Sequence, residues 1–126
     1  MNIEKVHTGD APEAIGPYSQ AAVVGDFVFT SGQIAINPKT GNVDAVTIKE
    51  QTKQVCENLS AVLRAAGSGL DRVIKTTCYL RNMEDFADFN AVYGEYFVGK
   101  PARSCVAVRE LPKGVLVEVD TIAYKN

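Results

Sequence analysis

The feature that most constrains this fold is an amphipathic helix predicted over residues 47–66. Its charged residues fall on one side, while its apolar residues recur at the spacing of one helical face: Ile48, Val55, Leu59, Val62, Leu63 and Ala66. Thr47 and Glu50 fit a capping box at its start, and Gly67 follows its end. A helix with one apolar face must bury that face against another element. We therefore expect a layered fold in which this helix packs on a sheet.

A second helix is predicted over residues 83–97, with Asn82 as its N-cap and Gly99 and Pro101 beyond its end. Its apolar face is aromatic and comprises Phe86, Phe89, Tyr93, Tyr96 and Phe97. Runs of β-forming residues predict strands at 3–7, 21–24, 27–31, 73–80, 103–109 and 115–124. Short turn sequences, Gly25-Asp26 and residues 111–114, predict that two pairs of these strands form hairpins.

The resulting order, β-β-β-α-β-α-β-β, predicts the α+β class. Each helix follows strands and precedes another strand, so both helices can cover one face of a single mixed sheet. The chain has 126 residues, of which 46% are hydrophobic, and this is enough for one core. We therefore assign residues 1–126 to a single domain.

Strand periodicity predicts which residues share a face of the sheet. If Glu110 pairs with Val115 across the last turn, then Arg103, Cys105 and Glu118 fall on one face. The valines of residues 115–124 fall on the other face, which should meet the helices. Two helices on one side leave the second face uncovered, so we expect a homo-oligomer with the Arg103 face near the subunit contact.

Composition and charge exclude several classes of function. The formal net charge is −2 and the pI is about 5.4, with no basic run, so nothing attracts nucleic acid over long range. The cysteines, Cys56, Cys78 and Cys105, lack the spacing of a disulfide framework or zinc ribbon. His7 is the only histidine, so we expect no metal site and assign His7 no role.

The chain shows no secretory signal and no apolar stretch near the ~20 residues that a membrane-spanning helix needs. We expect a soluble, cytoplasmic protein that binds neither membranes nor nucleic acid.

Arg103 is the residue that most suggests chemistry, because a guanidinium matches a carboxylate through two parallel hydrogen bonds. Taken alone, it is explained most simply by a surface ion pair with Glu118 or Asp120, since exposed pairs are common. Cys105 suggests a nucleophile, but a partly buried free cysteine more often packs in a core.

Four segments, taken together and in order, resemble the RidA (YjgF/YER057c/UK114) family of enamine/imine deaminases. They are Ile15-Gly16-Pro17-Tyr18-Ser19-Gln20, Thr30-Ser31-Gly32-Gln33-Ile34, Asn90-Ala91-Val92-Tyr93 with Tyr96-Phe97, and Pro101-Ala102-Arg103-Ser104-Cys105-Val106 with Val117-Glu118-Val119. One departure is the short connection Val98-Gly99-Lys100 before Pro101.

The resemblance implies a chorismate-mutase-like subunit and a homotrimer with a central barrel and active sites between subunits. It also implies hydrolysis of 2-iminobutanoate and 2-iminopropanoate to 2-keto acids and ammonia, without a cofactor. An imine carbon is already electrophilic, so positioning and modest acid–base catalysis can suffice.

Carried over by residue, the resemblance implies that Arg103 holds the substrate carboxylate and that Glu118 orients or activates water. Backbone groups of Gly32 and Cys105 would fix the substrate and the water. The resemblance also implies that Tyr18 and Ser31 are catalytic residues of the pocket and that Asn90 and Ser104 bind the substrate.

Plainer roles remain open for several of these residues. Tyr18 can staple its loop to the core, Ser31 can be a hydrogen bonder at a strand end, and Asn90 can satisfy buried backbone groups. Cys56 and Cys78 are expected to fill the core.

Three other functions are also open. The protein could be a trimeric regulator that binds small 2-keto or carboxylic acids without turnover, or a holdase-type chaperone. A ribonuclease or translation inhibitor has little support from the acidic composition.

Overall fold

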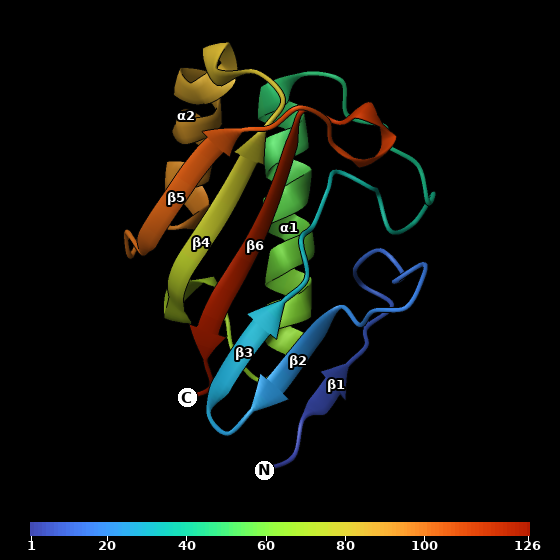
Figure 1. Cartoon of the computed structure of the whole chain (residues 1–126), viewed down its shortest axis with the longest axis vertical. Coiled ribbons are helices and arrows are strands. Elements are labelled where there is room, and N and C mark those ends of the chain that lie inside the picture. Colours follow the sequence, from blue (N-terminus) through green and yellow to red (C-terminus); the bar gives the residue numbers. More distant parts are fainter.

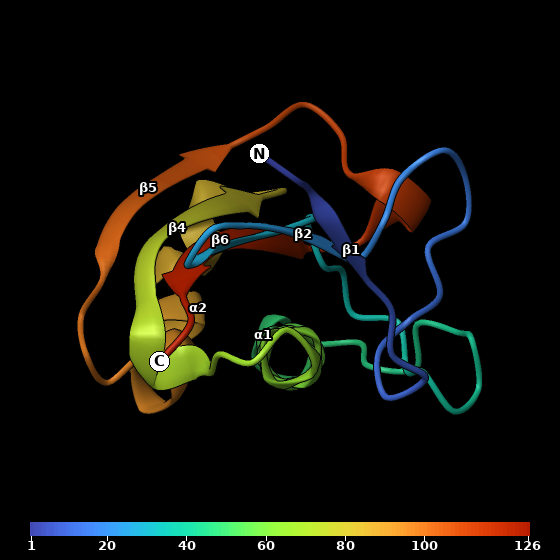
Figure 2. The same ribbon diagram turned by 90° about the horizontal axis from the view of Figure 1, so that it is seen from below.

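One six-stranded sheet carries two helices on one of its faces (Figures 1 and 2). The structure, a computed structural model, describes all of residues 1–126. The helices are α1 (Ile48–Ala65) and α2 (Phe86–Tyr96), and the strands are β1 (Glu4–Val6), β2 (Ala21–Val24), β3 (Phe27–Thr30), β4 (Val73–Leu80), β5 (Ala102–Ala107) and β6 (Val117–Tyr124). The predicted element order and the α+β class with both helices on one face are confirmed. No helix is long and apolar enough to cross a membrane.

The strands lie in the order β1-β2-β3-β6-β4-β5, and only the β4–β5 pair is parallel. The predicted hairpin between residues 103–109 and 115–124 is therefore wrong, because β4 lies between these strands. The chain leaves β5 and crosses the end of β4. There the Val108 amide donates to Leu80 at 2.9 Å and the Arg81 amide donates to Leu116 at 3.0 Å. These bonds lead the chain past β4 into β6.

This strand order changes which residues share a face. Arg103 lies beside Thr76 and Cys105 beside Cys78, and the side chains of both β4 residues are buried on the helix side. Glu118 lies beside Tyr79 on the open side of the sheet. Arg103 and Glu118 are thus on opposite faces, and the prediction that they share one is wrong. The valines of β6 do face the helices, as expected.

Helix α1 begins and ends as its sequence predicts. The hydroxyl of Thr47 accepts from the Glu50 amide at 3.1 Å, and the Glu50 carboxylate accepts from the Thr47 amide at 3.1 Å. Gly67 follows with φ of 85°, a left-handed conformation that favours glycine. Asn82 does not cap the second helix as predicted, because its side chain makes no capping hydrogen bond. A 3-10 turn, Met83–Asp85, precedes α2 instead.

The core lies between the sheet and the helices, and Cys56 and Cys78 are fully buried in it as predicted. The opposite face of the sheet carries no helix (Figure 2). Large apolar side chains are exposed on this open face, among them Phe27 (49% exposed), Phe29 (43%), Val106 (47%) and Tyr124 (39%). An exposed apolar patch on a sheet is typical of a surface that another chain covers.

Candidate functional site

The predicted site residues fall into two groups, one on each side of the sheet. The first group, which we call the carboxylate half-site, consists of Tyr18, Gly32 and Glu118. These residues line a cavity of about 320 Å³, formed by the loop before β2, the segment after β3, and β6. Apolar side chains complete its wall: Ile15, Ile34 and Ile36, with Pro12 and Pro112.

A β-bulge brings Gly32 against Glu118. The register between β3 and β6 shifts by one residue between the Phe29–Ile122 pair and the bridge from Gln33 to Val119. Within the bulge, the amide of Thr121 donates to the Thr30 hydroxyl at 3.0 Å. An added Cβ on Gly32 would overlap the Glu118 carboxylate, so a larger residue here would push that side chain out of its position beside the backbone.

The Glu118 carboxyl is a stronger base than an ordinary glutamate. Burial raises its pKa, and the charge of Asp120 on the same face raises the pKa further. Burial also raises the pKa of Asp120, although a hydrogen bond from the Tyr79 hydroxyl at 3.4 Å opposes this. A half-buried carboxylate of raised pKa, beside an open glycine backbone, is suited to hold a water molecule and accept its proton.

Ser31 precedes Gly32 but does not line this cavity; it lines a wider hollow of about 730 Å³, which Tyr18 also borders. The Ser31 hydroxyl donates to the Ser19 carbonyl at 2.6 Å, so it ties the loop of Tyr18 to β3. This matches the plainer role that the sequence left open for Ser31. The Tyr18 side chain is 53% exposed, so it does not staple its loop to the core.

The second group, which we call the guanidinium half-site, is built around Arg103 at the edge strand β5. Arg103 lines a cavity of about 310 Å³ with residues of α2 and of the short connection after it. Its Nη1 donates to the Asn90 Oδ1 at 2.7 Å. Asn90 therefore contacts Arg103 rather than buried backbone groups.

The only ion pairs in the structure are His7–Glu13 and Arg72–Asp71. Arg103 is thus paired with no carboxylate, and the surface ion pair with Glu118 or Asp120 is wrong. Most of its hydrogen-bond donors remain free to bind an anion.

Cys105 and Ser104 are neighbours in β5 and lie on opposite faces of the sheet. Burial raises the pKa of the Cys105 thiol, with a smaller opposing effect of Arg103, so the thiol is not activated as a nucleophile. Cys105 packs against the core cluster. Ser104 lies beside Thr77 on the other face of the sheet and is exposed.

Two buried amides that hold the cavity loops were missed by sequence reasoning. Gln20 is 1% exposed and bonds to backbone groups of Thr8 (2.7 and 3.1 Å) and Pro12 (2.8 Å). Asn58 donates from α1 to the carbonyls of Ile34 (3.1 Å) and Ile36 (2.9 Å). The signal for Asn58 was its position within the apolar stripe of α1, where a polar side chain needs buried partners.

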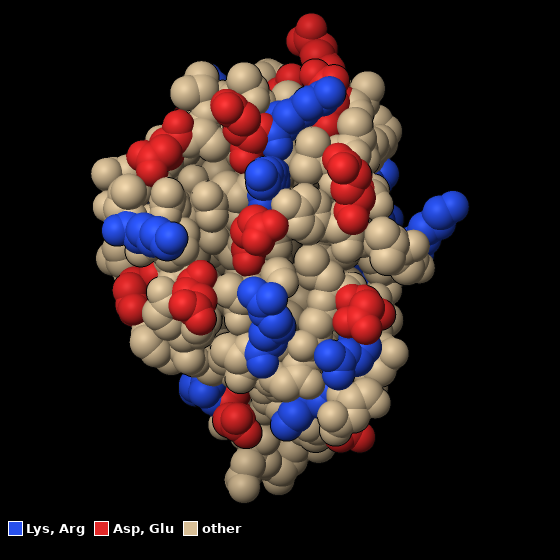
Figure 3. All heavy atoms as spheres, turned by 180° about the vertical axis from the view of Figure 1, so that it is seen from behind, with Lys and Arg blue, Asp and Glu red and all other residues tan.

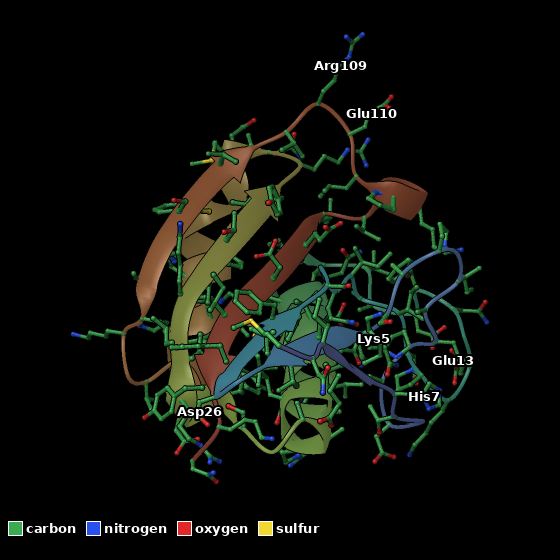
Figure 4. The ribbon with its side chains drawn as sticks, turned by 60° about the horizontal axis from the view of Figure 1, so that its bottom comes forward. Lys5, His7, Glu13, Asp26, Arg109 and Glu110 are labelled. Carbon is green, nitrogen blue, oxygen red and sulfur yellow. The ribbon has the colours of Figure 1, made fainter.

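On the face of the molecule that Figure 3 shows, charged residues form no patch of one sign. Figure 3 shows acidic and basic side chains interspersed over the back of the molecule. Arg109 and Glu110 project from the loop after β5, and His7 lies near Glu13 (Figure 4), with 3.1 Å between His7 Nε2 and the carboxylate. The structure gives no reason to revise the absence of a role for His7.

Comparisons with known proteins cover nearly the whole chain. A family model described as "Endoribonuclease L-PSP" matches residues 8–125. A RutC family protein of Pyrococcus horikoshii is 55% identical over 124 residues, which make up 98% of each chain. The structure of YyfA from Yersinia pestis, a protein of the conserved Rid family, has a TM-score of 0.95 and 45% identity, covering 98% of this chain and 99% of that one. The structure of E. coli TdcF with bound serine has a TM-score of 0.93 and 39% identity, with the same coverage.

Proposed function

Because this chain belongs to the RidA (YjgF) family, whose family model is described as "Endoribonuclease L-PSP", we propose that it hydrolyses reactive 2-imino acids to 2-keto acids and ammonia. The observation that carries the proposal is the pairing of an arginine free of any ion pair with a glutamate of raised pKa beside Gly32. The first can bind the carboxylate of such a substrate, and the second can activate water.

The complete site lies between two copies of the chain. Arg103 and Glu118 occupy opposite faces of one sheet, so the guanidinium half-site of one copy must meet the carboxylate half-site of another. The exposed apolar residues of the open face supply the contact between copies. A homotrimer, with each sheet facing a central barrel, is the assembly that we propose.

The reaction needs only water and proton transfer. Glu118 accepts a proton from water as the water oxygen bonds to the iminium carbon, which gives a carbinolamine. Glu118 then returns the proton to nitrogen, and it takes up the hydroxyl proton as the C–N bond breaks and the C=O bond forms. The released ammonia accepts this last proton from Glu118 and leaves as ammonium. The atoms balance as iminium plus water giving ketone plus ammonium. Backbone groups of Gly32 and Cys105 orient the reactants, and Arg103 holds the carboxylate throughout.

Small 2-imino acids fit the chemistry of the two half-sites. Isoleucine and proline side chains form part of the wall of the cavity beside Glu118, and they suit an aliphatic substituent such as the ethyl group of 2-iminobutanoate. The relative from E. coli has been solved with serine, a small amino acid that also carries a carboxylate. We therefore propose 2-iminobutanoate and 2-iminopropanoate as substrates.

Trapping of the free imine tests the proposal. A threonine dehydratase generates 2-iminobutanoate in the presence of semicarbazide, and added protein should lower the amount of trapped product. Arg103→Ala should lose about a hundredfold in activity, because the charged, bidentate contact disappears. Arg109→Ala is the matched control, since this exposed arginine contacts neither half-site. Equal activity of Arg103→Ala and wild type, or no effect of wild type on trapping, would contradict the proposal.

Two other outcomes would point elsewhere. Tight binding of 2-oxobutanoate without hydrolysis would identify a trimeric binder with a regulatory role. Degradation of RNA that survives in Arg103→Ala would support the ribonuclease class, which the interspersed surface charges do not favour (Figure 3).

A further inference from the structure

We propose that Phe86 and Tyr93 are positioning residues for Arg103, and that Thr76 fixes the ring of Tyr93. Their rings hold the guanidinium in the orientation that receives a carboxylate. The inference rests on the proposed function in one respect only, namely that a carboxylate ligand binds Arg103.

Arg103 needs such support because of where it lies. Its strand, β5, is an edge strand that pairs only with β4. Its one hydrogen bond, to Asn90, engages a single donor of the five that a guanidinium carries. A long side chain held at one point would lose rotamer freedom when it binds a ligand, which weakens binding. Additional contacts that leave the other donors free would avoid this loss.

The two aromatic rings provide contacts of that kind. The guanidinium carbon lies 4.9 Å from the centroid of the Tyr93 ring and 5.4 Å from that of Phe86. Both distances are within the range of about 6 Å for a cation–π interaction. Phe86, Asn90 and Tyr93 follow one another at intervals of four and three residues, so they share one face of α2. Three side chains of one helix face thus contact the same guanidinium.

The Tyr93 ring is itself held in place. Its hydroxyl bonds to the Thr76 hydroxyl at 2.8 Å, and its ring stacks on Phe97 with centroids 4.5 Å apart. Burial raises the pKa of Tyr93, so the hydroxyl keeps its proton and this bond at neutral pH. Thr76 is also the strand neighbour of Arg103. These contacts therefore connect Thr76 on β4 to Tyr93 on α2, and Tyr93 to Arg103 on β5.

Kinetics of matched variants test the inference. Phe86→Leu and Tyr93→Leu should raise KM about tenfold and change kcat less than about twofold. The orientation of Arg103 affects carboxylate binding equally in the ground state and the transition state. A loss of orientation should therefore raise KM and leave kcat nearly unchanged. The control is Phe89→Leu, the same change on the same helix. Phe89 is fully buried and contacts Tyr93 but makes no cation–π contact with Arg103. Phe89→Leu should lower Tm without raising KM.

Conservative variants separate the effect of the Tyr93 ring from the effect of its hydrogen bond to Thr76. Tyr93→Phe keeps the ring and should hold KM within about threefold of wild type, and Thr76→Val should behave alike. The double variant should be no worse than either single one, because both remove the same bond. A rise in KM for Phe89→Leu equal to that for Phe86→Leu would overturn the inference. So would a fall in kcat with unchanged KM in Tyr93→Leu.

Calorimetric binding of 2-oxobutanoate separates this inference from the proposed function. If wild type binds the keto acid, Phe86→Leu binds it about tenfold more weakly, and no imine is hydrolysed, the positioning role holds and the enzymatic proposal fails. If imine is hydrolysed but Phe86→Leu binds the keto acid as wild type does, the positioning role fails alone. Phe86→Leu decides the matter if Tyr93→Leu does not fold, because Phe86 is only partly buried.

Discussion

Arg103 and Glu118 are adapted to their proposed tasks by opposite physical means. Arg103 makes contacts with two rings and one amide, and these contacts engage few of its hydrogen-bond donors. Glu118 has no cationic partner, and burial makes its charged form less favourable. A charge without a stabilising partner costs folding free energy and increases basicity. The burial that makes Glu118 a stronger base therefore also costs folding free energy. The contacts of Arg103 serve its function without that cost.

The pH dependence of the stability of Glu118→Gln should reveal the folding cost of the Glu118 charge. Because the folded-state pKa of Glu118 is raised, the folded protein binds a proton more readily than the unfolded chain, and stability falls as pH rises through that range. We expect Glu118→Gln to be more stable than wild type at pH 7. The gain should vanish below about pH 4, where the group is protonated in both states. Urea unfolding across this pH range measures it.

The activity of wild type should change with pH in the opposite sense. The base must be ionised, so kcat/KM should fall as pH drops through a value above the usual 4.3 of glutamate. A Glu118→Gln variant that retains wild-type activity and the same acid limb would show that another group is the base.

At the scale of elements, sequence patterns predicted each helix and strand and the β2–β3 hairpin, but not the neighbours of β5 and β6. The aromatic face of α2 and the valine face of β6 were unambiguous. Strand β5 was not, since each of its faces mixes a polar and an apolar residue, with Arg103 and Cys105 on one and Ser104 and Val106 on the other. A short turn then favoured a hairpin, whereas the observed sheet pairs β5 in parallel with β4, the strand on the other side of α2 in the chain.

The same limit applies to the site. The resemblance named residues on both half-sites, but it could not tell on which face each one lies. The bulge that brings Gly32 to Glu118 arises from pairing between distant segments, β3 and β6, so no local pattern predicts it. The loop anchors Gln20 and Asn58 were missed because a buried amide is recognised by its partners, which only the fold supplies.

Gln20→Met should destabilise the protein by about 3 kcal/mol, because it removes the partner of the Thr8 amide and of three backbone carbonyls. Methionine is similar in length, so packing is largely kept. Gln54→Met is the control. Gln54 bonds only to the Asn58 side chain along α1, so this change leaves one acceptor without a partner, and we expect a smaller loss of about 1 kcal/mol. Urea unfolding compares the two, and equal losses would contradict the anchoring role of Gln20.

For the whole molecule, the uncovered sheet face and the divided site lead to the same expectation. The chain should assemble through its open face, and sedimentation should give a mass of three chains of 13.6 kDa. A single copy would hold both half-sites but could not bring them together, because the sheet lies between them.

Mixing two inactive variants should therefore restore activity. Arg103→Ala and Glu118→Gln chains, refolded together in equal amounts, should recover about one quarter of wild-type activity. Each site needs an intact arginine from one chain and an intact glutamate from its neighbour, and each is present about half of the time. The control mixes Arg103→Ala with the double variant, which can build no intact site. Failure of the first mixture to exceed the control would place both residues of a site within one chain.

The back-to-back placement of the half-sites also gives each chain a direction. If one face of each chain contacts the opposite face of the next chain, the contacts run head to tail. A row of such chains would have one unmatched half-site at each end. Only a closed ring leaves none unmatched. In such a ring the number of active sites equals the number of chains, and damage to one half-site in one chain disables one site and spares the rest.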